Sequence, residues 1–262
     1  MNTEQRPAVM ELVEAELGSL WGRKTPVLSQ VTWSVGTGDY WIVGGSASSG
    51  KSDLLTTAAG LLRPRRGTHR LFGRELTALS EEDLVRLRVR VGLVFEGEGR
   101  LFNRLTVMEN LALPLCYHRN CDLAGVADRV EAMLEFTGLS SFAHNTPENV
   151  TRAFRQRIVL ARALMLEPEV LFLDSPLRGQ DPRQTRWWLD FRSRLRAGRA
   201  PAATQPMTLV VSADNLSPWL EHAEQFAVIA ERRVIGLGDR AQVRRCSDGA
   251  VRELLADDIS HN

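Results

Sequence analysis

One glycine-rich loop constrains the fold of this chain more than any other segment. The loop fits the pattern G-x-x-x-x-G-K-[ST] and comprises Gly45, Ser46, Ala47, Ser48, Ser49, Gly50, Lys51 and Ser52. An apolar run, Tyr40–Val43, precedes the loop, and residues 53–62 behind it have helical spacing. Strand, loop and helix in this order predict an α/β domain that binds phosphate groups. A glycine-rich turn that matches by chance is disfavoured by the flanking strand and helix.

The chemistry of the loop predicts a nucleotide ligand. Backbone N–H groups of such a loop surround phosphate oxygens, and the N-terminus of the following helix adds partial positive charge. We expect Lys51 to reach the outer phosphates and the Ser52 hydroxyl to bind Mg²⁺. Asp53 places a carboxylate in the first turn of the helix, where it suits the helix dipole but repels a nucleotide. We therefore expect weakened affinity.

Further periodic segments extend this α/β interpretation. Alternating residues from Val27 to Val43, around the turn Gly36–Asp39, predict a hairpin. A capping box at Ser80 predicts a helix over 81–90, followed by a buried strand at 91–95. Helical periodicity dominates residues 106–166, with expected segments near 107–114, 123–137 and 154–165. The apolar runs 170–174 and 208–212 are typical of strands in a parallel sheet.

Composition excludes several classes of function. The chain has 33 Lys and Arg against 32 Asp and Glu, so it lacks the overall basic charge that nucleic-acid binding requires, and no nucleic-acid partner is expected. Its apolar runs fall short of the ~20 residues of a membrane-spanning helix. The acidic N-terminus is unlike a secretory signal, which favours a cytoplasmic location. Cys116, His118 and Cys121 lack a fourth metal ligand, and reduced thiols are the preferred interpretation.

Three segments carry a resemblance to a known family. The loop at 45–52, the segment Arg155–Leu164 and the run Val170–Asp174 occur in an order and spacing that resemble the ATPase subunits of ABC transporters, over about residues 10–255. Residues 109–115 and 179–182 look most similar to the ATPases of Mla/MCE lipid-transport systems.

The resemblance implies a fold and partners. It implies one nucleotide-binding domain over 1–262, of the P-loop NTPase type, with a mostly parallel central sheet and an antiparallel β subdomain. A helical subdomain at about 98–165 would be inserted, and the second part of the core would follow at about 166–255. The implied ligands are ATP and Mg²⁺. The implied partners are a second nucleotide-binding subunit, in a homodimer or heterodimer, and permease subunits that hold the chain at the inner face of the membrane.

Position by position, the resemblance assigns roles to four residues. Trp21 falls where an aromatic ring stacks on adenine, although it could equally be a surface or core aromatic. Ser52, Asp174 and Glu96 fall on the metal-binding positions.

The chain departs from the family pattern where the family performs hydrolysis. Ser175 stands where a glutamate prepares the attacking water, and a neutral hydroxyl cannot take that proton near neutral pH. Ala213 replaces a histidine that contacts the γ-phosphate, and Glu96 replaces a glutamine. In the signature, Arg152 and Ala153 replace two glycines. We therefore predict ATP binding with impaired or absent hydrolysis.

Two alternatives remain open. Hydrolysis would persist if Glu96, Asp174 or a residue of a partner replaced the missing base. Alternatively, the chain would be a structural partner that binds no nucleotide, as Asp53 and the altered signature allow.

Overall fold

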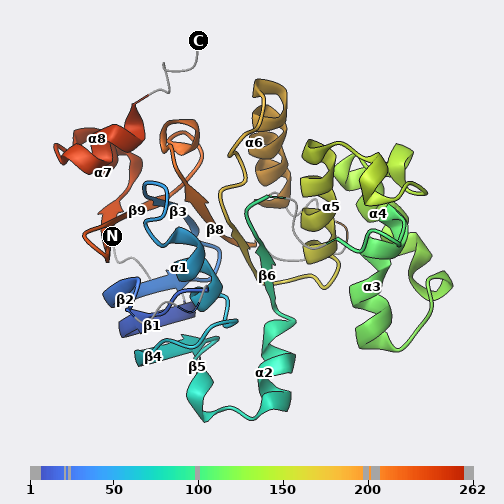
Figure 1. Ribbon diagram of the computed structural model, residues 1–262, viewed down its shortest axis with the longest axis horizontal. Helices are drawn as coiled ribbons and strands as arrows, with labels where there is room; N and C mark the ends of the chain where they lie inside the picture. The colour runs from blue at the N-terminus through green and yellow to red at the C-terminus, as the bar shows by residue number, and fades with distance from the viewer. Residues whose placement is uncertain are drawn as a thin grey trace.

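The computed structural model describes residues 7–20, 22, 25–97, 101–196, 201 and 207–256, and within them a six-stranded sheet forms the centre of the molecule (Figure 1). Its order is β10-β9-β3-β8-β7-β6, with β10 antiparallel to β9 and the other neighbours parallel. The strands are β3 (Tyr40–Gly44), β6 (Val91–Val94), β7 (Val170–Leu173), β8 (Thr208–Ala213), β9 (Gln225–Ala230) and β10 (Arg233–Gly238). The predicted mostly parallel sheet is confirmed.

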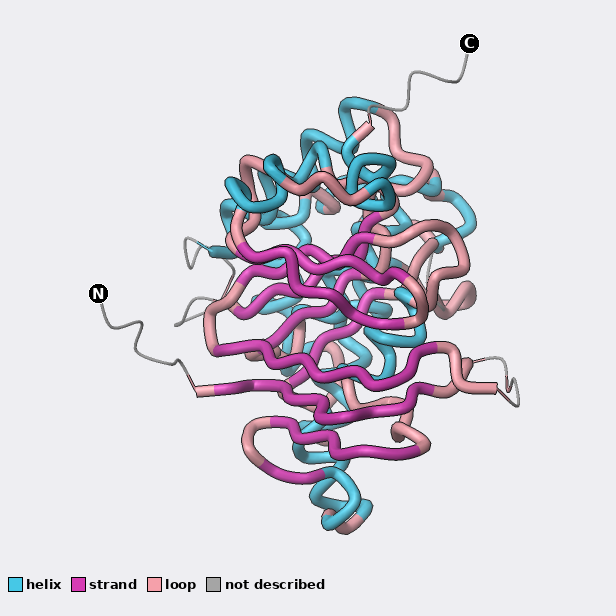
Figure 2. Tube along the Cα trace, turned by 90° about the vertical axis from the view of Figure 1, so that its left-hand side faces the viewer, coloured by secondary structure: helices cyan, strands magenta, loops and turns pink. Residues whose placement is uncertain are grey.

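A second, antiparallel sheet is formed by strands that come before and after the glycine-rich loop in sequence. All strands are drawn in magenta in Figure 2. The order of the second sheet is β2-β1-β4-β5, formed by β1 (Ala8–Leu17), β2 (Leu28–Gly36), β4 (Arg66–Leu71) and β5 (Arg74–Glu75). The predicted hairpin over 27–43 is wrong, because β2 pairs with β1 whereas β3 pairs with β8 and β9. The turn instead carries the chain from one sheet to the other, closed by the Gly36 N–H donating to Asp39 Oδ2 at 2.7 Å.

The helix after the loop packs against both sheets. This helix, α1 (Lys51–Ala58), is shorter than the predicted 53–62 at its C-terminal end. Leu54 and Leu55 are fully buried and belong to one apolar cluster with Trp33 of β2 and Phe172 of β7. Burial of each such side chain contributes about 1.5–3 kcal/mol. The cluster fixes the position of α1, and with it the end of the loop.

Three contacting helices lie between β6 and β7 in the chain and gather on one side of the molecule in Figure 1. They are α3 (Val107–Arg119), α4 (Ala127–Thr137) and α5 (Arg152–Leu164), all within the stretch predicted to be helical. A capping box between Thr106 and Glu109 begins α3. The helix then continues past Pro114, where the sequence predicted its end. The remaining α-helices of the described residues are α2 (Glu81–Arg88), α6 (Pro182–Arg196), α7 (Arg240–Arg245) and α8 (Gly249–Leu255).

Helices in the described ranges are short or carry charge. None of them combines the length and the apolar character that crossing a membrane demands.

Candidate nucleotide-binding site

The site forms where the carboxyl ends of parallel strands meet. Residues 45–52 follow β3, Glu96 lies two residues beyond β6, Asp174 directly follows β7, and Asp214 directly follows β8. In open α/β sheets this edge is where ligands bind, because the loops that leave the strands converge there. The fold therefore collects segments that are more than 100 residues apart in sequence.

The loop needs its glycines for steric reasons. Gly50 has φ +102°, and a Cβ there would lie 2.7 Å from Val27 Cγ1. A Cβ on Gly45 would lie 2.5 Å from Ser49 Oγ. Gly50 is also the N-cap of α1, and because it has no side chain it does not cap the first N–H groups of that helix. The first N–H groups of a helix can bind an anion, and the phosphate-binding role of this helix start stays a prediction.

Lys51 is buried and fully hydrogen-bonded. Its side chain is 5% exposed, and Nζ donates to the carbonyl oxygens of Gly45 at 2.5 Å and Ser46 at 2.7 Å. The third acceptor is Asp214 Oδ1 at 2.9 Å. The carbonyl oxygens of Gly45 and Ser46 belong to the loop, so these two bonds hold the Lys51 ammonium group over the loop. The third acceptor is a carboxylate that a phosphate group would have to replace.

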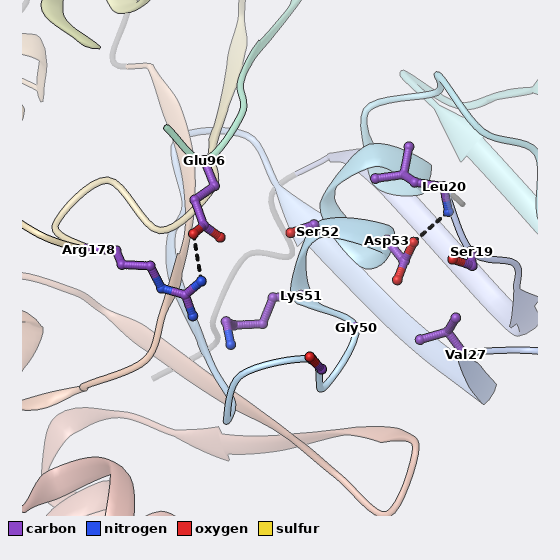
Figure 3. Close-up of a pocket in the computed structure, with 10 residues that line it drawn as sticks. Ser19, Leu20, Val27, Gly50, Lys51, Ser52, Asp53, Glu96 and Arg178 are labelled. Atoms are coloured by element: carbon purple, nitrogen blue, oxygen red, sulfur yellow. Dashed lines mark hydrogen bonds and ion pairs between the residues drawn. The ribbon is translucent and has the colours of Figure 1, made fainter. Parts of the chain in front are cut away.

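A cavity of about 240 Å³ lies beside the loop (Figure 3). Its lining residues are Ser19, Leu20, Val27, Ser48, Gly50, Lys51, Ser52, Asp53, Glu96 and Arg178. The predicted residues Lys51, Ser52 and Glu96 thus share one cavity. Asp53 lines it too, but its Oδ1 accepts the Leu20 N–H at 2.7 Å, and Figure 3 shows it turned toward Leu20. Trp21, the predicted adenine contact, lies outside the described residues.

Sequence reasoning did not identify Arg178, although its side chain bonds to two carboxylates of the site. Nε and Nη2 donate to the two oxygens of Asp214 at 2.6 and 2.8 Å, and Nη1 donates to Glu96 Oε1 at 2.6 Å. The hydrogen bonds to Asp214, and then those to Glu96, raise the pKa of Arg178 against the effect of burial. The available signal was its position, four residues after Asp174 at the end of β7.

Asp214 is the carboxylate that joins the two cations. Partial burial opposes its ionisation, but hydrogen bonds from Arg178 and Lys51 together with their charges hold its pKa below the usual range. Asp214 is therefore ionised at neutral pH. A carboxylate with a lowered pKa is also a weak base, which matters for any reaction that needs a proton acceptor.

The predicted metal ligands are only partly brought together. Ser52 and Glu96 supply a hydroxyl and a carboxylate to one cavity, and oxygen ligands of this kind suit Mg²⁺. Asp174 is 3% exposed, accepts a hydrogen bond from Ser212 Oγ at 2.7 Å, and is not among the residues that line the cavity. Across the described ranges, no three or more His, Cys, Asp and Glu side chains cluster as a metal site would require, Cys116, His118 and Cys121 included.

Ser175 and Ala213 line a neighbouring cavity of about 430 Å³. Ser175 is buried at φ +46°, and its N–H donates to Ser212 Oγ at 2.9 Å. Ala213 is the last residue of β8 and has no polar side-chain atom. Among the residues that line this cavity, the charged ones are Arg178 and Asp214. Within the described part of the chain, the carboxylate that lines this cavity is therefore Asp214, which is already paired with two cations.

The expected signature segment lies at the start of α5. Thr151 is the N-cap of this helix, and the side chains of Thr151 and Arg152 are exposed. A Cβ added to Gly179 would lie 3.6 Å from Arg152 Nη1, so Arg152 approaches the loop that follows β7.

Comparison with known proteins identifies the family. Residues 28–178 match the family described as ABC transporter, which is more than half of the chain. The chain belongs to the ABC transporter family.

Relatives of this ABC protein include ATP-binding proteins of importers. "Methionine import ATP-binding protein MetN 2" of Bacillus cereus is 35% identical over 164 residues, which cover 63% of this chain and 48% of the relative. The protein of the same name from Paraburkholderia xenovorans is 32% identical over 241 residues, covering 90% of this chain and 59% of the relative. The chain thus spans about half the length of the curated relatives it matches.

Solved structures share the fold. CbiO1 from Clostridium perfringens, part of the ABC transporter complex cbiONQ, superposes with a TM-score of 0.77 at 20% identity and 91% coverage of both chains. The ATP-binding cassette MJ0796, bound to ADP and Pi in a dimeric post-hydrolysis structure, gives 0.75 at 22% identity, with 86% of this chain and 96% of that chain covered. The predicted ABC-type α/β fold is confirmed.

The family assignment also bears on ligands and subfamily. ABC proteins of this kind bind ATP with Mg²⁺, which agrees with the predicted cofactors. The predicted similarity to Mla/MCE lipid-transport ATPases is not supported, because these relatives carry the name of methionine importers instead.

Proposed function

We propose that this chain is the ATP-binding subunit of an ABC transporter, and that it binds Mg-ATP at residues 45–52 with slow or no hydrolysis of its own. The observation that carries the proposal is the loop itself. Gly45 and Gly50 leave no room for a Cβ, Lys51 is held over the loop, and the N-cap residue of α1 has no side chain that could cap the helix. This combination suits a polyphosphate chelated with Mg²⁺.

The surroundings of the loop support slow hydrolysis. Ser175 offers a neutral hydroxyl that hydrogen-bonds with Ser212, and Ala213 offers no polar group. Glu96 is in an ion pair with Arg178, and Asp214 has a lowered pKa. Loss of a general base costs about 10²–10⁴ in rate. We therefore expect turnover by this chain alone to be close to background.

Family membership supports the partners in this proposal. We expect the chain to dimerise with a nucleotide-binding subunit and to attach to permease subunits at the inner face of the membrane. The names of the relatives favour import, with methionine as the first cargo to examine, over lipid transport.

Equilibrium binding of a fluorescent ATP analogue to the purified chain tests the central claim. We expect saturable, Mg²⁺-dependent binding that Lys51→Ala weakens by about tenfold or more, because a charge-assisted bond to phosphate is lost. Arg74→Ala is the matched control, since Arg74 is half exposed and pairs with Asp83 outside the cavity. Saturation curves that Lys51→Ala leaves unchanged would reject the proposed site.

Phosphate release separates the alternatives. Release by the wild-type chain well above that of Lys51→Ala would show an active ATPase and refute slow hydrolysis. Absence of any nucleotide binding by the folded wild-type chain would leave the structural-partner alternative.

A further inference from the structure

One carboxylate oxygen is shared by two cations in the site. Asp214 Oδ1 accepts a hydrogen bond from Lys51 Nζ at 2.9 Å and another from Arg178 Nη2 at 2.8 Å. The second oxygen of Asp214 accepts from Arg178 Nε at 2.6 Å. The carboxylate therefore sits in a fork formed by an ammonium and a guanidinium group. Guanidinium and ammonium groups are also the side-chain groups with which proteins bind phosphate.

Arg178 borders the same cavity as the phosphate loop. It lines the 240 Å³ cavity together with Gly50, Lys51 and Ser52, and it also lines the neighbouring cavity of Ser175 and Ala213. Figure 3 shows its guanidinium group on the Lys51 side of the cavity, opposite Asp53. The bonds to Asp214 and Glu96 use three of its five N–H groups. Both Nη atoms therefore keep an N–H for a further acceptor.

The charged side chains of the site balance one another. Lys51 and Arg178 carry positive charge, and Asp214 and Glu96 carry negative charge, in one continuous chain of ion pairs. In loops of this pattern the lysine reaches the β- and γ-phosphates. A terminal phosphate that bonds to Lys51 Nζ would replace Asp214 Oδ1 and would thereby meet Arg178 Nη2 as well.

We propose that Lys51 and Arg178 together form a two-cation site for the terminal phosphate of a nucleoside triphosphate, and that Asp214 competes with this phosphate for both cations. The proposal rests on the proposed function, because it names a further residue of the same site. Arg178 then distinguishes ATP from ADP, since ADP lacks the phosphate that reaches between the two cations. Asp214 acts as an internal competitor of that phosphate.

Affinities for fluorescent ATP and ADP analogues in Mg²⁺ test the proposal. We expect Arg178→Gln to weaken ATP binding by about tenfold or more and ADP binding by less than about threefold. Arg178→Lys, which keeps the charge but not the planar fork, should fall between wild type and Arg178→Gln. Asp214→Asn should tighten ATP binding, because it removes the competing charge. Arg240→Gln, which alters an ion pair with Glu221 outside both cavities, is the control and should change neither affinity.

Different results of these binding measurements would refute the two-cation site and the proposed function. Equal changes for ATP and ADP in Arg178→Gln, or tighter ATP binding by that variant, would overturn the two-cation site while nucleotide binding stands. Weaker ATP binding by Asp214→Asn would overturn the role of Asp214 as a competitor. Failure of the wild-type chain to bind either analogue would refute the proposed function itself. A thermal melt of each variant at neutral pH shows whether it is folded.

Discussion

Protonation of His69 should destabilise the folded chain at mildly acidic pH. His69 lies in β4, its side chain is 2% exposed, and burial lowers its pKa from 6.5 to about 4. Below pH ~6.5 the unfolded chain binds a proton at this site whereas the folded chain does not, so the free energy of unfolding falls. The contribution is complete above that pH and is lost progressively as pH falls toward 4. Between about pH 7 and pH 4.5 the expected loss is about 2 kcal/mol.

Urea unfolding of wild type and His69→Gln across this pH range measures the effect. Gln at this position has no titrating proton, so we expect its free energy of unfolding to fall less than that of wild type by about 2 kcal/mol. Any constant cost of the substitution cancels, because the comparison is between pH values. His118→Gln is the control, since His118 is exposed. Parallel pH profiles for wild type and His69→Gln would refute the reasoning.

Two further substitutions test the core and the start of α3. Phe172→Ala, at a fully buried position in β7, should lower the free energy of unfolding in urea by about 3–5 kcal/mol, whereas Tyr117→Ala, at a position 80% exposed, should cost less than about 0.5 kcal/mol. Asn110→Ala should cost about 1–3 kcal/mol and speed hydrogen exchange at the Phe102 amide, because buried Asn110 accepts that N–H and donates to the carbonyls of Phe102, Leu105 and Thr106. An unchanged exchange rate at Phe102 would contradict this role of Asn110.

Local signals predicted those elements whose pattern is complete within one segment. The cap at Ser80 accepts from the Asp83 N–H, and α2 begins where the acids of its first turn indicated. The runs that form β7 and β8 are buried at every position, as a central parallel strand requires. The sequence did not predict strand β1. Glu14 lies in it at φ +48°, and the pairing register with β2 shifts there, so buried and exposed residues do not alternate regularly along the strand. Strand β3 pairs with residues near 209 and 226, which are far away in sequence. A turn pattern next to β3 therefore cannot reveal these partners.

In the candidate site, too, local patterns were predictable and contacts between distant segments were not. The loop at 45–52 was predictable because its chemistry and its flanking elements lie within one short segment. The role of Arg178 was not predictable, because it depends on the ends of β6, β7 and β8 meeting in space. The metal-binding role of Asp174 stays a prediction, and in the structure one of its oxygens accepts a hydrogen bond from Ser212 Oγ.

Packing of α1 between the two sheets has a consequence for ligand affinity. The helix is held by an apolar cluster that includes residues of β1, β2, β7 and β8. Because protein interiors are close-packed, α1 and the residue at its N-cap cannot shift without moving both sheets. The anion-binding end of the helix is thus organised before a ligand arrives. This end of the site therefore loses little conformational freedom when a ligand binds, which removes one cost of association.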